Sequence, residues 1–259
     1  MSSISDGIVI GSSLVNKIED QITSKTRAIM CVHMNGIPCR MDAIAEIAHK
    51  HRLIVLEDSA QSFGAMFKHS LCGSFGEFAA FSMHPLKNLN ALGDGGMIVT
   101  NNNKFYKWVL RARNNGHPDR DHCDFWSHNM RLDAIHALFL DIKLKNYEKL
   151  IQRRNQNVKL FKQKLDGEIK YQKIGKKYRS VYQTFIIKVK KRDKLLTYLK
   201  KNNVEAKIHY PIPIHKLKAF KKTNKLVKLP ITEQLSKEIL TLPAMEYVNK
   251  KQIKFISSL

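Results

Sequence analysis

Several features that define particular classes of protein are missing from this 259-residue chain. No stretch approaches the roughly 18 consecutive apolar residues of a membrane-spanning helix, so we expect no membrane association. Residues 1–7 contain no basic segment followed by an apolar core, and we expect no secretory signal there. The 4 cysteines lie far apart without a CxxC pair. This spacing argues against a disulfide framework or a metal cluster and favours a cytoplasmic protein.

Acidic residues are also scarce, and the scarcity is confined to the second part of the chain. The whole sequence has 45 Lys and Arg against 22 Asp and Glu, a formal net charge of +23. Residues 1–150 are nearly balanced, with 17 basic and 15 acidic residues, whereas residues 151–259 hold 28 and 7. One interpretation of residues 151–259 is a basic module that binds nucleic acid. Because the lysines are scattered and no nucleic-acid-binding motif is present, we favour a lysine-rich solvated surface and expect no nucleic-acid partner.

What is present is typical of a globular α/β protein, with 43% hydrophobic and 26% charged residues. Apolar runs at residues 27–33 and 53–56 flank a segment at 41–51 with apolar residues at helical spacing. Strand, helix and strand within about 30 residues predict a βαβ unit and a parallel sheet. Two further strands are predicted at residues 78–82 and 97–100, which would extend this sheet.

The rest of the chain predicts a change of architecture. An apolar stripe predicts one long helix over residues 131–165. We therefore divide the chain into a partial large domain (1–130), the connecting helix (131–165) and a small C-terminal α/β domain (166–259). The other elements predicted are helices at 102–113, 192–202, 231–240 and 249–259 and strands at 181–189 and 204–208.

Polar residues stand where the predicted strands end. Asp58 and Gln61 follow the second strand, Ser82 ends the third, and Lys87 comes five residues later. Ligands of open α/β sheets bind at the carboxyl ends of strands. A lysine held among apolar neighbours is partly desolvated, which lowers its pKa and makes a free amine available for Schiff-base chemistry. Each residue alone is consistent with an ordinary loop, but the set predicts a site.

The turn after Lys87 is rich in glycine. Gly93, Gly95 and Gly96 lie within four residues of one another. We expect these glycines to serve a tight turn that requires positive φ angles, and not to bind phosphate directly.

These residues belong to a set of motifs that resembles the DegT/DnrJ/StrS-type sugar aminotransferases, pyridoxal-phosphate enzymes of fold type I. The resemblance runs in order along nearly the whole chain. It implies an α/β fold with an incomplete, mostly parallel large-domain sheet and a smaller C-terminal α/β domain. The motifs are EDSAQS (57–62), GSFG (73–76), KNL (87–89), ALGDGG (91–96), RNNG (113–116), NMRLD (129–133) and IHYPIPIH (208–215).

The resemblance implies a role for each matched position. Lys87 would be the catalytic residue, joined to pyridoxal 5′-phosphate as a Schiff base and later moving a proton between two carbons. Asp58 would face the pyridine nitrogen, Gln61 the cofactor ring, and Ser82 the cofactor phosphate. Asn129 would reach the phosphate in the neighbouring subunit, which implies a homodimer.

Two further residues, His209 and Tyr210, lie in a segment that approaches the sugar-nucleotide site in such enzymes. Some relatives carry histidine in place of the lysine and act as dehydratases, so Lys87 favours aminotransfer. The nearby His84 does not replace it, and we expect His84 and His33 to be structural. No metal ligands are predicted.

The function that the resemblance implies is transfer of an amino group, with glutamate as donor, to a nucleotide-linked keto sugar in amino-sugar or cell-surface polysaccharide biosynthesis. The 208–215 motif favours the subgroup that acts at the 3-position of deoxysugars, and a 4-position enzyme remains open. Relatives carry a further segment ahead of the stretch that begins near Gly11. The alternative is therefore a truncated, non-catalytic remnant or a partner subunit that needs a separate N-terminal fragment. Mild departures from the family pattern occur at Asn35, Asn90 and Met130.

Overall fold

The computed structural model describes residues 15, 17–165, 169–223 and 227–259. These residues form two compact units. The sheet unit consists of residues 18–149 and 177–181. The C-terminal unit consists of the described parts of residues 1–17, 150–176 and 182–259.

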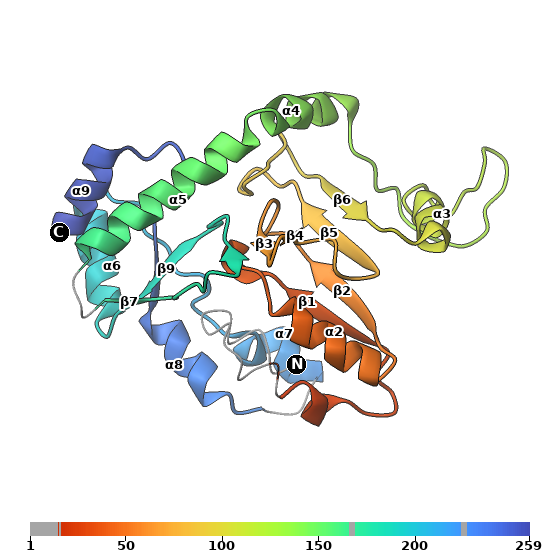
Figure 1. Ribbon diagram of the computed structural model, residues 1–259, viewed down its shortest axis with the longest axis horizontal. Coiled ribbons are helices and arrows are strands. Elements are labelled where there is room, and N and C mark those ends of the chain that lie inside the picture. Colours follow the sequence, from red (N-terminus) through yellow and green to blue (C-terminus); the bar gives the residue numbers. More distant parts are fainter. Residues whose placement is uncertain (1–14, 16, 166–168, 224–226) are drawn as a thin grey trace. The chain divides into compact units, whose positions relative to one another are not determined.

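The sheet unit is built on four strands in the order β1-β2-β5-β6 (Figure 1). The first three are parallel, and β6 pairs antiparallel with β5. All four strands lie within one or two residues of the ranges that the apolar runs predict. The sheet is therefore mostly parallel, as expected. Their bounds are β1 (Ala28–Val32), β2 (Ile54–Asp58), β5 (Phe78–Ser82) and β6 (Gly96–Val99).

Helix α2 (Met41–Lys50) covers one face of this sheet. Its buried residues repeat at helical spacing, so a single stripe faces the strands. The Cys31 thiol of β1 donates to Met41 Sδ at 3.7 Å, which places the start of the helix on β1. Arg52 then adopts a positive φ of 53° in the turn that leads into β2. The βαβ unit expected from the sequence is confirmed.

The other elements of the sheet unit are short. Helix α3 (Asn103–Ala112) begins at Asn102, whose side chain accepts hydrogen bonds from the N–H groups of Lys104 and Phe105. A second sheet has the order β4-β3-β8. Its strands are β3 (Met66–Phe67), β4 (Ser70–Leu71) and β8 (Tyr178–Arg179).

The range predicted as one long helix, residues 131–165, is two helices. They are α4 (Ala134–Leu144) and α5 (Tyr147–Lys164). At the break the Asn146 N–H bonds to Lys143 O, three residues back, which tightens the last turn. Tyr147 is 5% exposed, and its hydroxyl donates to Phe63 O at 2.8 Å. This long-range hydrogen bond fixes the start of α5, so the helix is interrupted where the apolar stripe predicted a continuous one.

The C-terminal unit has its own three-stranded sheet and hydrophobic core. Its strand order is β10-β9-β7, all antiparallel. Phe161, Ile187, Leu240 and Ile253 are at most 1% exposed and lie in one buried cluster. The elements are β7 (Lys170–Tyr171), β9 (Phe185–Lys188), β10 (Ile239–Leu242), α6 (Arg192–Lys201), α7 (Lys218–Thr223), α8 (Pro230–Glu238) and α9 (Lys250–Ser258).

Three predictions differ from the structure in this unit. The strand expected at 204–208 is reduced to one bridge between Lys207 and Thr241, because the Val204 N–H still caps helix α6 through Leu199 O. The helix expected at 231–240 ends at Glu238, and the next residues pair with β9 instead. The strand expected at 181–189 is limited to β9. Within the described residues, no helix has the length and apolar character needed to cross a membrane.

Candidate functional site

Two of the expected site residues lie at the carboxyl edge of the sheet. Asp58 ends β2 and Ser82 ends β5, and the two strands are parallel neighbours. Asp58 is paired with Ala80, so Asp58, Ala80 and Ser82 share one face of the sheet. The fold thus brings together two side chains that are 24 positions apart in sequence, at the edge where ligands bind.

Asp58 is partly buried and retains accepting capacity. Its Oδ1 accepts the N–H of Ala60 at 3.0 Å, which holds the carboxylate in place. No described residue donates a hydrogen bond to its Oδ2. A positively charged group of a ligand is therefore a suitable partner for this oxygen.

Gln61 is oriented by the backbone of a neighbouring loop. Its Oε1 accepts the N–H of Asn35 at 2.6 Å. Asn35 is 6% exposed and has a φ of 61°, a conformation that is uncommon for residues other than glycine. Its N–H group is the donor of this bond. This bond connects the loop after β1 to the loop after β2.

Lys87 lies in the loop between β5 and β6. Burial lowers the pKa of its ammonium group, although the nearby charge of Asp58 acts in the opposite direction. No described side chain accepts a hydrogen bond from its Nζ. A partly desolvated amine without a bound acceptor is available to react with a carbonyl compound.

Buried neighbours fix the loop that carries Lys87. Asn88 is 5% exposed and its Nδ2 donates to Val181 O at 3.1 Å. The Ala91 N–H bonds to Met83 O, and the Met83 N–H bonds to Gly95 O, both at 2.8 Å. The anchoring role of Asn88 was not predicted from the sequence. Its amide is a possible signal, because a buried side-chain amide must find a hydrogen-bond partner.

The glycines of this loop do not have the role predicted for them. Gly93, Gly95 and Gly96 all lack a positive φ, so the expected turn geometry was wrong. Close packing explains two of them instead. A Cβ on Gly95 would lie 2.7 Å from Leu132 Cδ1, and one on Gly96 would lie 3.0 Å from Phe81 O.

Ser82 and Asn129 have less definite surroundings. The Ser82 Oγ accepts the His84 N–H at a long 3.4 Å, so its hydroxyl is only weakly engaged. Asn129 is exposed, forms a bridge with Asn114, and accepts a bond from Arg131 Nε at 2.6 Å. None of these bonds links Asn129 to the residues around Lys87, and its role stays a prediction.

His209 and Tyr210 belong to the C-terminal unit. The His209 Nδ1 lies 2.9 Å from Thr241 Oγ1. Burial lowers the pKa of His209, and the charge of Lys207 lowers it further. Tyr210 is 58% exposed, with its ring 5.6 Å from that of His209. Their part in binding a substrate also stays a prediction.

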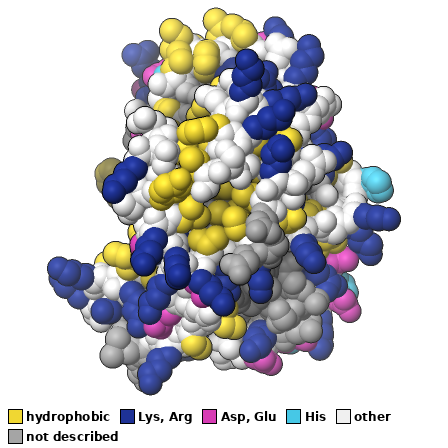
Figure 2. All heavy atoms as spheres, turned by 90° about the vertical axis from the view of Figure 1, so that its left-hand side faces the viewer, with side chains coloured by type: hydrophobic (Ala, Val, Ile, Leu, Met, Phe, Trp, Pro, Cys, Tyr) yellow, Lys and Arg dark blue, Asp and Glu magenta, His cyan; other side chains and the backbone are white. Residues whose placement is uncertain are grey.

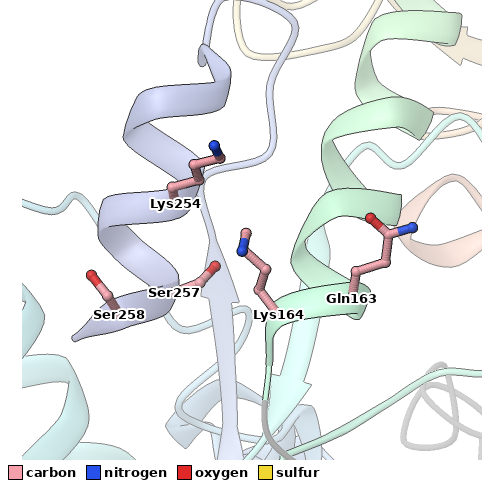
Figure 3. A pocket seen from close by; sticks show the side chains of 5 residues that line it. All are labelled: Gln163, Lys164, Lys254, Ser257 and Ser258. Carbon is pink, nitrogen blue, oxygen red and sulfur yellow. The ribbon is translucent and has the colours of Figure 1, made fainter.

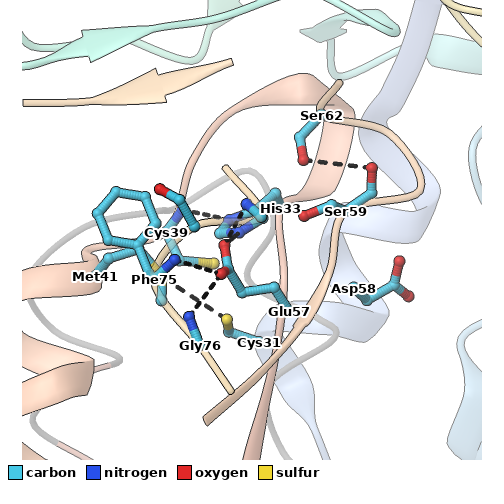
Figure 4. A network of polar contacts seen from close by, with 12 residues as sticks. Cys31, His33, Cys39, Met41, Glu57, Asp58, Ser59, Ser62, Phe75 and Gly76 are labelled. Carbon is cyan, nitrogen blue, oxygen red and sulfur yellow. Dashed lines mark hydrogen bonds and ion pairs between the residues drawn. The ribbon is translucent and has the colours of Figure 1, made fainter. Parts of the chain in front are cut away.

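A buried network beside Asp58 was not predicted from the sequence (Figure 4). The Cys39 N–H donates to His33 Nδ1 at 3.1 Å, so the other ring nitrogen, Nε2, carries the proton that is donated to Glu57 Oε2 at 2.9 Å. Glu57 also accepts the N–H groups of Gly73, Phe75 and Gly76 at 2.7–2.8 Å. His33 and Glu57 are both at most 2% exposed. This network holds the end of β2, and it confirms the structural role expected for His33.

The basic side chains on the side of the molecule drawn in Figure 2 are not gathered in one cluster. Figure 2 shows Lys and Arg side chains spread among apolar and uncharged groups over the side that it displays. A shallow polar depression of about 320 Å³ lies between α5 and α9 (Figure 3). It is lined by Gln163, Lys164, Lys254, Ser257 and Ser258. These side chains lie in the unit that does not contain Lys87.

Residues 12–258 match the sequence profile of the DegT/DnrJ/EryC1/StrS aminotransferase family. The chain belongs to this family. The match covers both the sheet unit and the C-terminal unit, and it agrees with the resemblance seen in the motifs.

Named relatives in the DegT/DnrJ/EryC1/StrS family are similar over most of this chain. It is 37% identical over 239 residues to dTDP-3-amino-3,6-dideoxy-alpha-D-galactopyranose transaminase of Aneurinibacillus thermoaerophilus, covering 92% of this chain and 66% of that protein. It is 34% identical to UDP-N-acetyl-3-dehydro-alpha-D-glucosamine 3-aminotransferase of Acidithiobacillus ferrooxidans, covering 93% and 65%. The chain thus spans slightly less than two thirds of these two relatives.

Solved structures of DegT/DnrJ/EryC1/StrS family proteins have the same fold. The S. venezuelae DesV crystal structure, in complex with a ketimine intermediate, superposes with a TM-score of 0.90 at 30% identity. That match covers 94% of this chain and 67% of DesV. Helicobacter pylori PseC, an aminotransferase, matches with a TM-score of 0.89 at 21% identity and supports the fold. The α/β fold expected from the sequence is confirmed.

Proposed function

We propose that this chain carries the lysine site of a pyridoxal-phosphate-dependent aminotransferase that acts on a nucleotide-linked keto sugar. One observation carries the proposal. The half-buried Lys87 amine has no acceptor among the described residues and lies within the electrostatic influence of Asp58, at the carboxyl edge of the sheet. In a member of this family, that arrangement suits an aldehyde cofactor with a basic ring nitrogen.

The residues of the sheet unit fit such a cofactor. Lys87 Nζ would bond covalently to the aldehyde carbon of the cofactor with release of water, and burial, which lowers the pKa of this group, raises the unprotonated fraction that reacts. Asp58 Oδ2 would accept a hydrogen bond from a protonated ring nitrogen and stabilise its charge. When bound, pyridoxal phosphate supplies an electron-poor ring that accepts the electron pair left behind by a departing proton.

Three other side chains would position the cofactor, namely those of Gln61, Ser82 and Asn129. Gln61, held by the Asn35 N–H, would lie beside the ring. The weakly engaged Ser82 hydroxyl would donate to the phosphate. Lys87, once released from the cofactor, would carry a proton on Nζ between the two carbons that exchange the amino group. Asn129 would complete the phosphate site of a second subunit, which makes the active form a homodimer.

The substrate class rests on the relatives. The two named relatives at 34–37% identity are a dTDP-sugar and a UDP-sugar aminotransferase, and both names refer to the 3-position of the sugar. We therefore propose a nucleotide-linked 3-keto sugar as acceptor and glutamate as amino donor, with His209 and Tyr210 near the substrate. The reaction would take place in the cytoplasm and serve amino-sugar or polysaccharide synthesis.

A second candidate function is a partner subunit or a non-catalytic remnant of such an enzyme. The observation that favours it is the coverage of the relatives, 65–66% of their length for the two named above. In this case the chain would hold Lys87 and Asp58, while another polypeptide would supply the remaining contacts to the cofactor.

Cofactor titration tests the first candidate. The wild-type chain, the Lys87→Ala variant and a matched Lys104→Ala control would each be mixed with pyridoxal phosphate, followed by absorbance and by mass spectrometry after borohydride reduction. We expect a new absorbance band and a reduced adduct on Lys87 in the wild type and the control, and neither in Lys87→Ala. An equal band in Lys87→Ala would contradict the proposal. A band that the wild type forms only with a second polypeptide would favour the partner subunit.

A further inference from the structure

Two cysteine side chains lie together in the sheet unit (Figure 4). Cys31 belongs to β1 and is 6% exposed, whereas Cys39 lies in the loop that leads from β1 to α2 and is partly exposed. The Cys39 thiol donates to Val32 O at 3.2 Å, one residue after Cys31. The Cys31 thiol lies 3.7 Å from Met41 Sδ, two residues after Cys39. The strand and the loop thus place the two sulfur atoms beside each other.

The surroundings of Cys39 favour its ionised thiolate form. A hydrogen bond from the Cys31 thiol lowers the pKa of Cys39 below its ordinary value of 9.0, and the contact with His33 lowers it further, although burial acts in the opposite direction. The same hydrogen bond raises the pKa of Cys31, which therefore stays a protonated thiol. Cys39 also directly precedes the N-cap residue of α2, where the partial positive charge of the helix stabilises an anion.

This arrangement has the properties of a peroxide-reactive cysteine pair. The thiolate is the nucleophilic form of cysteine. Cysteines that react with peroxides are accessible to solvent, have a low pKa and lie next to a second thiol that resolves the first oxidation product. Cys39 is partly exposed and favoured as a thiolate, and Cys31 is the second thiol beside it. Neither thiol has a part in the cofactor chemistry proposed for Lys87.

We propose that Cys39 and Cys31 form a redox-active pair that reacts with hydroperoxides and closes to a reversible disulfide. The Cys39 thiolate attacks one oxygen of hydrogen peroxide, the O–O bond breaks, and a sulfenic acid and hydroxide result. The Cys31 sulfur then attacks the Cys39 sulfur and displaces its hydroxyl group as water. The hydroxide takes up the proton that Cys39 lost on ionisation. In total, two thiols are oxidised to one disulfide, and one peroxide is reduced to two water molecules.

Closing this disulfide moves the loop between β1 and α2. The sulfur atoms of a disulfide are about 2.05 Å apart, closer than two thiols in contact, so Cys39 is drawn toward β1. The same loop carries Asn35, whose N–H group holds Gln61 Oε1 at 2.6 Å. We therefore expect oxidation to displace Gln61 and to slow the reaction of Lys87 with the cofactor. Only this last effect rests on the proposed function, because the oxidation itself needs no cofactor.

Peroxide treatment followed by mass spectrometry tests the proposal. The full chain would be exposed to hydrogen peroxide, alkylated and digested with trypsin. Trypsin cleaves after Arg27 and Arg40 and leaves both cysteines in one peptide, residues 28–40. We expect this peptide to lose two hydrogen atoms and to resist alkylation. Treatment with dithiothreitol should restore both thiols.

Serine variants assign the roles of the two cysteines. In Cys31→Ser we expect the sulfenic acid of Cys39 to persist, so that dimedone captures it. In Cys39→Ser we expect Cys31 to stay reduced, because it is buried and remains a thiol. The matched control is Cys123→Ser, which removes an exposed cysteine from the loop after α3 and should leave the disulfide in peptide 28–40 unchanged. Circular dichroism checks that each variant is folded, and the wild-type peptide decides the outcome without any variant.

Two results would overturn the proposal. One is that both thiols of peptide 28–40 stay reduced in wild type under conditions that oxidise the exposed Cys123. The other is a disulfide that joins Cys39 to the buried Cys72 in place of Cys31.

The effect on the site is measured separately. Oxidised and reduced wild type would be mixed with pyridoxal phosphate after removal of peroxide, and the absorbance band of the Lys87 adduct followed in time. A displacement of about 1 Å can slow a reaction by about 100-fold, and we expect a slowing of about tenfold or more. Equal rates would contradict the link from the loop to Gln61. A chain that forms the disulfide but no adduct in either state would count against the proposed function alone.

Discussion

The two faces of the four-stranded sheet come from alternate residues of the same strands, yet they differ in burial and in hydrogen bonding. The covered face packs on α2 and contains the His33–Glu57 network, with every strong hydrogen-bonding group of Glu57 satisfied. The opposite face, which we call the open face, has the exposed apolar residues Met30, Ile54 and Ile98 and, at its carboxyl edge, Asp58 and the weakly engaged Ser82. The covered face therefore has its polar groups satisfied within the chain, while the open face keeps hydrogen-bonding capacity for a ligand at Asp58 and Ser82.

Removing the charge of Glu57 should give the largest effect on stability. In Glu57→Gln an amide N–H₂ group replaces one carboxylate oxygen. This group then faces N–H donors that need an acceptor. Each carboxylate oxygen accepts two buried N–H groups, and each donor that loses its acceptor costs about 1–3 kcal/mol, so we expect a loss of about 3–5 kcal/mol in the free energy of unfolding. Urea unfolding followed by circular dichroism measures it. The exposed Glu46→Gln on α2 is the control and should change stability by less than about 0.5 kcal/mol.

The second prediction concerns Gly76, which donates its N–H to Glu57. A Cβ at this position would lie 2.5 Å from the Val55 backbone oxygen, which cannot move without disturbing β2. We expect Gly76→Ala to cost about 1–3 kcal/mol through overpacking. At Gly93 the nearest atom is in the mobile His136 side chain, at 3.0 Å. Gly93→Ala should therefore cost less, and equal losses would show that backbone crowding is not the cause.

Neighbouring residues of β2 compare the two faces directly. Val55 points to the covered face and is 8% exposed, whereas Ile54 points to the open face and is 40% exposed. We expect Val55→Ala to lose about 1–2 kcal/mol of unfolding free energy. Ile54→Ala should lose less than about 0.5 kcal/mol in the isolated chain. A larger loss at Ile54 would mean that the open face is already covered in solution.

The smallest expected effect is a dependence of stability on pH. Burial raises the pKa of Glu57, but the hydrogen bonds from His33 and from the N–H groups of Gly73 and Gly76 outweigh it and hold the pKa below the ordinary value of 4.5. The ionised group therefore stabilises the fold above about pH 4.5, and this contribution is lost as the pH falls through the folded-state value. The slope for one group is at most about 1.4 kcal/mol per pH unit. Urea unfolding at several pH values measures this effect. The difference in free energy of unfolding between the wild type and Glu57→Gln should become smaller as the pH is lowered.

Local sequence patterns predicted much of the sheet unit. The apolar runs at residues 27–33, 53–56 and 78–82 each form a strand, because short apolar runs bounded by turn residues are typical of strands in a parallel sheet. They also predicted which polar residues gather at the carboxyl edge. The break between α4 and α5 was not predicted, because it depends on the bond from Tyr147 to Phe63, 84 positions away.

The same distinction holds for the site. Asp58, Ser82 and Lys87 were predicted as site residues because each ends or follows a strand that the sequence marks, and their roles stay predictions. Glu57 was missed because the alternation that directs Asp58 to the open face sends its neighbour to the covered one, where its importance comes from N–H groups 16–19 positions later. The glycines after Lys87 were misread since only packing distances distinguish a crowded glycine from one with positive φ.

The sequence by itself determined the family, the strands and the set of side chains at their carboxyl ends, because these follow from local apolar patterns and from motifs that preserve their order. Only the tertiary structure decided which side chains are satisfied and which remain available. Four hydrogen bonds fix the Glu57 carboxylate, whereas the Lys87 amine has no acceptor among the described residues. Burial and partner distance depend on segments far apart in the chain, and no local pattern encodes them.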